Sequence, residues 1–100
     1  MQETQRFYLD CIYDTRKSFY GKAVVVIQED KYICKNYLLY SYDTLVAIYT
    51  ITTNGIKQYD CLGKFSQTTT RHQKEFFKQY GLSDKEIKEV FDKGVLVYEF

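Results

Sequence analysis

The sequence has one histidine, three cysteines, and neither tryptophan nor proline among its 100 residues. A triad hydrolase needs a nucleophile, a base and an orienting group, and His72 is the one histidine available as the base. Cys11, Cys34 and Cys61 lie far apart without C-x-x-C spacing, and no histidine pair or acidic cluster suggests a metal. The isolated glycines form neither a phosphate loop nor a dinucleotide motif. We therefore expect no metal and no cofactor, and assign no catalytic residue.

Long apolar segments are also missing. No apolar run approaches the ~20 residues that span a bilayer, and no signal peptide opens the chain. An odd number of scattered cysteines is typical of a reducing interior. We expect a soluble protein of the cytoplasm that does not contact a membrane. The length is typical of a single domain with one core, which we place at residues 1–100.

A strong global charge is absent as well, since the formal net charge is +1. Residues 1–81 carry an excess of basic side chains and residues 82–100 an excess of acidic ones, so any basic site must be local. Eleven tyrosines and seven phenylalanines are present instead. Tyrosine combines an apolar ring with a polar tip, which suits half-exposed sheet faces and binding surfaces alike.

Most of the chain before residue 63 has the pattern of β-strands. Alternation with a period of two and short apolar runs predict strands at Arg6–Tyr13, Ala23–Ile27, Lys31–Lys35, Tyr37–Tyr42, Leu45–Thr53 and Ile56–Leu62, with a β-prone tail at Val95–Phe100. Residues 1–5 are polar and expected to fray. Turns are expected at Glu29-Asp30, at Ser41–Thr44 and at Asn54-Gly55, the last as a type I′ hairpin turn. Short turns between successive strands indicate an antiparallel meander of about five or six strands.

Two helices are predicted near the C-terminus. The first covers Thr68–Gly81, with threonine hydroxyls at its start and Gly81 at its end. One face is aromatic, and the opposite face carries Arg71, Lys74 and Lys78. The second begins at the capping box Ser83–Glu86, flanked by Leu82 and Ile87 as a hydrophobic staple, and stops at Gly94. The fold class is therefore α+β, with two C-terminal helices packed on an antiparallel sheet.

Two charged segments form the candidate binding site. Together they supply the cations Arg16, Lys17, Lys22, Arg71, Lys74 and Lys78 and the rings Phe19 and Tyr20. If the segments are neighbours, they form a basic-aromatic patch that can engage phosphates and stack bases. The same residues could be ordinary solvated charges or anchors for another protein. His72, on the aromatic helix face, is either a packing residue or the base of a metal-free RNase.

Three segments carry a resemblance to a known group of proteins: Tyr13–Ala23, Leu39–Ala47 and Thr68–Phe76. They resemble a small domain encoded by phages and plasmids of low-GC Gram-positive bacteria, over about residues 13–81. Residues 82–100 extend beyond the usual end of that domain.

In size and character the chain also resembles the phage- and plasmid-borne anti-CRISPR inhibitors of type II-A Cas9. The resemblance implies Cas9 as the partner and a mechanism in which the inhibitor binds guide-free Cas9 and interferes with guide RNA loading. A nucleic-acid mimic would be strongly acidic, and this chain is not. It would therefore bind through shape and aromatic contacts, or compete for the guide RNA. The alternatives are a small RNA- or single-strand-binding module and an RNase acting on guide RNA.

Overall fold

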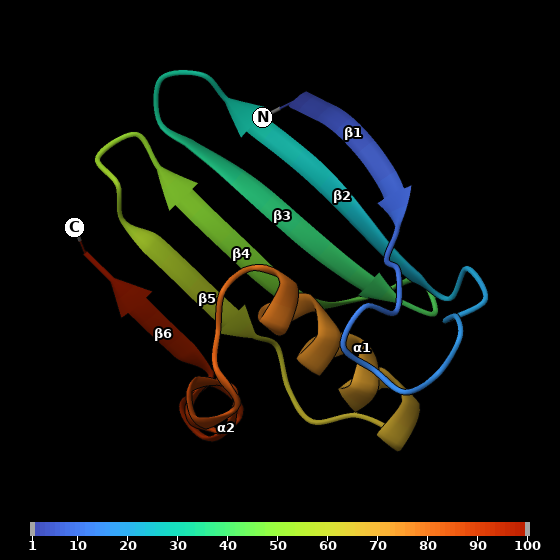
Figure 1. Cartoon of the computed structure of the whole chain (residues 1–100). Coiled ribbons are helices and arrows are strands. Elements are labelled where there is room, and N and C mark those ends of the chain that lie inside the picture. Colours follow the sequence, from blue (N-terminus) through green and yellow to red (C-terminus); the bar gives the residue numbers. More distant parts are fainter. Residues whose placement is uncertain (1, 100) are drawn as a thin grey trace.

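A six-stranded antiparallel sheet carries two helices on one of its faces (Figure 1). The computed structural model describes residues 2–99. The elements are β1 (Gln2–Tyr8), β2 (Ala23–Asp30), β3 (Cys34–Ser41), β4 (Thr44–Thr52), β5 (Lys57–Cys61), α1 (Gln67–Gln79), α2 (Asp84–Lys93) and β6 (Val95–Tyr98). The strands lie in chain order, β1 to β6, and each pairs antiparallel with the next. The predicted α+β meander with two C-terminal helices is confirmed.

The first strand is displaced toward the N-terminus from its predicted position. It was expected at Arg6–Tyr13 after a frayed start, but β1 pairs with β2 from Gln2 to Tyr8. The N–H of Leu9 still donates to the carbonyl of Ala23 at 2.9 Å, and the chain then leaves the sheet. Leu9 is buried and Cys11 packs against the core. The apolar residues that alternate in this segment therefore pack against the core without forming a strand.

The two strands predicted at Lys31–Lys35 and Tyr37–Tyr42 are replaced by one continuous strand, β3, which begins at Cys34. The preceding turn was expected at residues 29–30 but falls at residues 31–33, because Glu29 and Asp30 still pair with β3. Glu29 faces Lys35 across the ladder, and opposite charges in this position favour pairing. The carboxylate of Asp30 then closes the turn by accepting the N–H of Tyr32 at 3.0 Å.

The type I′ geometry was assigned to the wrong hairpin. Tyr42 and Asp43, between β3 and β4, have φ angles of 49° and 66°, whereas Gly55 has positive φ and Asn54 does not. The connection from β4 to β5 is a longer turn, in which the hydroxyl of Thr52 accepts the N–H of Ile56 at 3.1 Å. The hairpin predicted at Asn54-Gly55 exists, but its turn type was wrong.

The C-terminal end of α1 is set by the predicted residue, but its N-terminal end is not. Ser66 is the N-cap, and its hydroxyl accepts the N–H of Thr69, which already lies inside the helix. At the other end Gly81 has a φ of 106°, and the N–H groups of Gly81 and Leu82 donate to the carbonyls of Lys78 and Phe77. This pair of bonds is a Schellman motif, so Gly81 stops the helix as predicted.

The second helix has the capping box that the sequence predicts. The hydroxyl of Ser83 accepts the N–H of Glu86, and the carboxylate of Glu86 accepts the N–H of Ser83. Leu82 and Ile87 are both buried at the staple positions. Gly94 ends the helix in a left-handed conformation, and β6 follows and pairs with β5.

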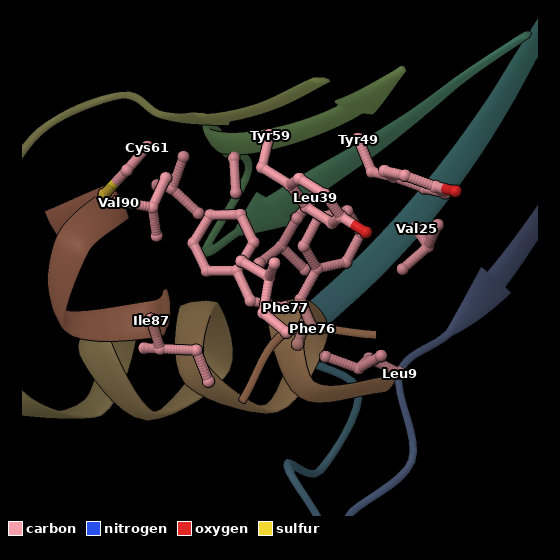
Figure 2. Packing of buried hydrophobic residues seen from close by; sticks show 14 of the residues in the cluster. Leu9, Val25, Leu39, Tyr49, Tyr59, Cys61, Phe76, Phe77, Ile87 and Val90 are labelled. Atoms are coloured by element: carbon pink, nitrogen blue, oxygen red, sulfur yellow. The ribbon is translucent and has the colours of Figure 1, made fainter. Parts of the chain in front are cut away.

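The core lies between the sheet and α1, with α2 closing one side (Figure 2). Phe76 and Phe77 have no exposed surface and lie against Leu39 and Tyr59 (Figure 2). Burying each phenylalanine contributes roughly 1.5–3 kcal/mol. The predicted aromatic face of α1 is therefore its core face.

Candidate functional site

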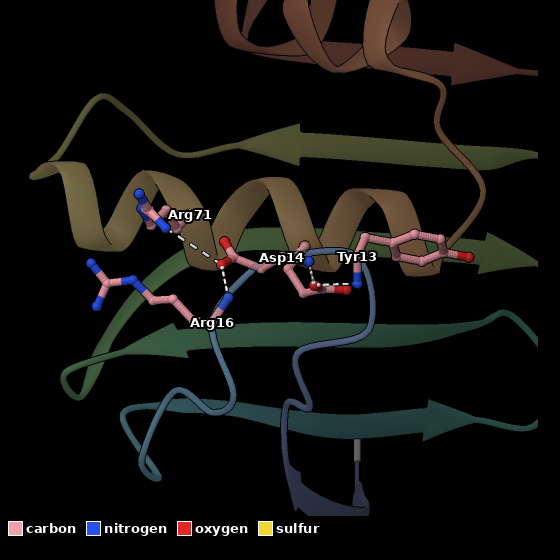
Figure 3. Close-up of polar contacts among 5 residues, drawn as sticks. Tyr13, Asp14, Arg16 and Arg71 are labelled. Atoms are coloured by element: carbon pink, nitrogen blue, oxygen red, sulfur yellow. Dashed lines mark hydrogen bonds and ion pairs between the residues drawn. The ribbon is translucent and has the colours of Figure 1, made fainter.

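The long segment 9–22 between β1 and β2 is fastened to the outer side of α1 by a buried carboxylate. Glu75 is 2% exposed, and its Oε1 accepts the N–H groups of Tyr13 and Asp14 at 2.9 and 2.7 Å (Figure 3). Its Oε2 accepts a hydrogen bond from the side-chain amide N–H of Gln79 at 2.8 Å, and the same amide nitrogen donates to the carbonyl of Asp10. A buried carboxylate without such donors would be costly, so these bonds define the path of the loop.

Asp14 continues this connection toward the helix N-terminus. Its Oδ1 accepts the N–H of Arg16 at 2.9 Å and lies 3.4 Å from Nη1 of Arg71 (Figure 3). Asp14 therefore bridges the backbone of Arg16 and the side chain of Arg71, the first cations of the two predicted charged segments. These two residues are neighbours in the fold.

His72 lies beneath this loop in a buried polar cluster. Its Nδ1 is 2.7 Å from the hydroxyl of Ser41, which is 2.9 Å from the hydroxyl of Thr69. The rings of Phe19 and Tyr42 pack on the imidazole, with centroid distances of 4.5 and 5.8 Å. Burial lowers the pKa of His72 below its ordinary value. With 1% of its surface exposed, His72 packs the loop onto the helix, which favours the packing interpretation over a general base.

A small depression opens above His72, with a volume of about 180 Å³. We call it the basic-aromatic hollow, and its lining residues are Arg16, Ser18, Phe19, Tyr20, Lys22, Tyr42, Thr68, Arg71 and His72. Two of its tyrosines are presented in an unusual backbone conformation: Tyr20 and Tyr42 have φ angles of 53° and 49°, and their side chains are 76% and 52% exposed. The N–H of Tyr42 donates to the carbonyl of Lys22 at 2.9 Å and joins the two turns.

Non-glycine residues rarely adopt positive φ, which costs roughly 1–2 kcal/mol each. Such positions cluster at functional sites when the surrounding structure holds them in place. Two exposed tyrosines held this way beside three cations make the hollow a candidate site.

The structure brings together five of the eight predicted site residues. Arg16, Phe19, Tyr20, Lys22 and Arg71 line the basic-aromatic hollow. Lys17 is exposed beside it without lining it. Phe19 was expected as a ring available for stacking, but it is 5% exposed and belongs to the core, because its ring packs against His72. Only a small part of Phe19 is therefore accessible from the hollow.

Lys74 and Lys78 face a second, larger depression between α1 and α2. We call it the inter-helix groove; its volume is about 710 Å³, and its lining residues are Tyr13, Asp14, Thr70, Arg71, Lys74, Glu75, Lys78, Asp84, Ile87, Lys88, Phe91 and Asp92. Arg71 lines both depressions, which therefore adjoin each other at this residue. Lys78 pairs with Asp84 at 2.9 Å and lies over the ring of Tyr13 at 5.6 Å.

Sequence reasoning missed Tyr13, Tyr42 and Glu75 as parts of these sites. The two tyrosines belong to turns whose partners lie far away in the chain. The position of Glu75 could have been noticed in the sequence, because it lies next to Phe76 in the predicted helix. A carboxylate beside an apolar helix face needs hydrogen-bond donors if it is buried.

Among residues 2–99, no cluster of three histidine, cysteine, aspartate or glutamate side chains is arranged to hold a metal ion. Neither of the two helices in this range has the length and apolar character needed to cross a membrane.

The architecture and these surfaces define a small α+β protein built on a six-stranded meander. A family model matches residues 7–93, and the chain belongs to this family, DUF8033, a family of unknown function. The match includes the 9–22 loop, both helices and both depressions, and it stops before β6. Comparisons with curated proteins and with solved structures give no match.

Proposed function

We propose that this protein is a non-enzymatic inhibitor of type II-A Cas9, encoded by a phage or plasmid of a Gram-positive bacterium. It acts in the cytoplasm of the host, where it binds guide-free Cas9 and interferes with guide RNA loading. Cas9 as the partner rests on the resemblance of the three segments described above. The binding surface rests on the way these segments meet in the fold.

The observation that supports a shared binding site is that the three segments converge at one end of the molecule. Tyr13–Ala23 forms the loop, Leu39–Ala47 the β3–β4 hairpin, and Thr68–Phe76 most of α1. They contact one another through the Ser41–His72 hydrogen bond and the Asp14–Arg71 ion pair.

The character of the hollow supports contact mainly through aromatic rings. Tyrosine is enriched among residues that dominate interface energies, because its ring buries a large rigid area and its hydroxyl forms hydrogen bonds. Tyr20 and Tyr42 project from the surface here, with Arg16 and Lys22 beside them. With a net charge of +1, the protein would bind the enzyme by shape and aromatic contacts and not by imitating nucleic acid.

The first experiment is a native gel of the purified protein with labelled guide RNA, with guide-free Cas9, and with preassembled Cas9–guide complex. We expect a complex with guide-free Cas9 that blocks later loading of the guide. No complex with Cas9 in any lane would contradict the proposal.

RNA binding is the second candidate, and the cations of the hollow favour it. The double variant Arg16→Glu/Lys17→Glu separates the two functions. An RNA binder would lose affinity, and its remaining affinity would depend less on salt, whereas a Cas9 binder held by aromatic anchors would tolerate the change. Lys31→Glu is the control, since Lys31 is exposed in the turn at the opposite end of β2.

A denaturing gel of the same RNA tests the nuclease alternative. Intact RNA after incubation would exclude it. If the RNA is shortened, His72→Gln decides whether cleavage depends on the one histidine.

A further inference from the structure

The inter-helix groove has an apolar floor and charged walls. Ile87 and Phe91 of α2 line the floor, and Ile87 is 4% exposed. Phe91 is half-buried and packs edge-on against Phe77 of the core, with centroids 6.2 Å apart, so it is a rigid part of the floor. Tyr13 forms one wall and is 56% exposed. The volume of about 710 Å³ lies within the usual range of ligand sites, roughly 300–1,000 Å³.

The carboxylates of the groove are largely engaged within the protein. Asp14 is paired with Arg71, the Glu75 carboxylate accepts backbone N–H groups, and Asp84 is paired with Lys78. These groups leave little unsatisfied negative charge at the end of the groove where α2 begins.

Lysines predominate at that same end. Lys78, Lys88 and Lys74 all act on Asp84 and lower its pKa, in that order of strength. All three lysines line the groove together with Asp84, and among the described residues Lys78 alone of the three forms an ion pair, so Lys74 and Lys88 leave an excess of positive charge there. Lys74 and Lys88 are exposed and come from the two opposite walls of the groove, α1 and α2.

This arrangement distinguishes a protein segment from a nucleic acid. A nucleic-acid strand carries a charge at every nucleotide, so several phosphates would lie along walls on which four cations, Arg71, Lys74, Lys78 and Lys88, are balanced by four carboxylates, Asp14, Glu75, Asp84 and Asp92. A peptide can place one or two carboxylates at Lys74 and Lys88 and apolar side chains on the floor. Amphipathic segments bind such grooves between helices in this way.

We propose that the inter-helix groove is a docking site for an amphipathic protein segment that sets an apolar side chain against Ile87 and Phe91 and a carboxylate between Lys74 and Lys88. This site goes beyond the proposed inhibition of Cas9, because it shares only Arg71 with the basic-aromatic hollow and does not depend on which protein carries the segment.

Selection from a phage-displayed library of random 12-residue peptides on the immobilised protein tests the proposal. We expect enriched peptides that combine aromatic or branched apolar residues with Asp or Glu. One enriched peptide, made synthetically, should lose at least tenfold in affinity for Lys74→Glu/Lys88→Glu. The matched control is Lys85→Glu/Lys93→Glu, which changes the net charge equally on residues outside the groove and should retain binding.

Amide chemical shifts give the second measurement, made with the same peptide and with a single-stranded RNA. The peptide should shift signals of Lys74, Lys88 and Phe91 and leave those of Tyr20 and Tyr42 unchanged. No enrichment, peptides without acidic residues, equal binding to the Lys74/Lys88 variant, or RNA shifts centred on the groove would each overturn the proposal. Since these measurements contain no Cas9, their failure and a failure of Cas9 binding would be separate results.

Discussion

Replacing Glu75 by alanine is expected to destabilise the protein strongly although the residue is charged and lies on a helix. The substitution removes the acceptor of two backbone N–H groups, those of Tyr13 and Asp14 at 2.9 and 2.7 Å, and the partner of Gln79. An unsatisfied buried donor costs about 1–3 kcal/mol. Because the loop can admit water after the truncation, we expect the lower part of this range for each donor, and a total of about 2 kcal/mol.

For a domain of this size, that loss corresponds to a fall in Tm of roughly 8–16 °C. Urea unfolding followed by circular dichroism measures the free energy, and hydrogen exchange at the amides of Tyr13 and Asp14 locates the effect. Glu75→Gln retains one oxygen for these amides and should cost less, about 1 kcal/mol.

Glu89→Gln is the control for Glu75, because Glu89 forms a surface ion pair with Lys93 at 3.8 Å on α2. Surface pairs of this kind are worth roughly 0–1 kcal/mol. If Glu75→Ala costs no more than the control, or if exchange at Tyr13 and Asp14 does not accelerate, the carboxylate does not hold the loop.

Three further predictions concern His72, Tyr20 and Tyr98. Burial lowers the pKa of His72 in the folded state, so the unfolded chain binds this proton more readily. The free energy of unfolding should therefore decrease as the pH falls below about 6.5. Urea midpoints measured from pH 5 to 8 should show this decrease in the native protein and not in His72→Gln. Tyr20→Gly should leave the free energy of unfolding unchanged or raise it by up to about 1 kcal/mol, because the φ of 53° at this position suits glycine. Partner binding should weaken. A clear drop in Tm would show that Tyr20 does not strain the backbone. Tyr98→Phe removes the hydroxyl that donates to Glu86 and lowers the pKa of that carboxyl, so an NMR titration should find the Glu86 pKa raised, and an unchanged value would argue against the bond.

Features specified by neighbouring residues were predictable from the sequence. The capping box at Ser83–Glu86 and the stop at Gly81 depend on groups within a few residues. The aromatic face of α1 followed from the helical period, and the meander followed from short turns. These are local consequences of backbone geometry, which is why they were recoverable.

Features that depend on distant contacts were not predictable. Phe19 reads as an exposed ring among cations, and only its contact with His72 on α1 shows that it is an anchor. The alternation after Tyr8 has the period of a strand, but β2 begins at Ala23 and offers no further residue for this segment to pair with. Five of the eight predicted site residues came together in one hollow because Asp14 reaches Arg71, a contact that no local pattern specifies.

The order of the sheet has a consequence for how the chain folds. Strands β1 to β5 are sequence neighbours in the sheet, and the turns from β2 onward span only a few residues. Hairpins of this kind close rapidly, in roughly 1–10 µs for an isolated one. The polar contacts of Asp10, Tyr13 and Asp14 in the 9–22 loop with α1, by contrast, join residues 57 to 69 positions apart. Loop closure over such distances slows folding, so the hairpins should form early and both surface depressions should be completed only when α1 docks.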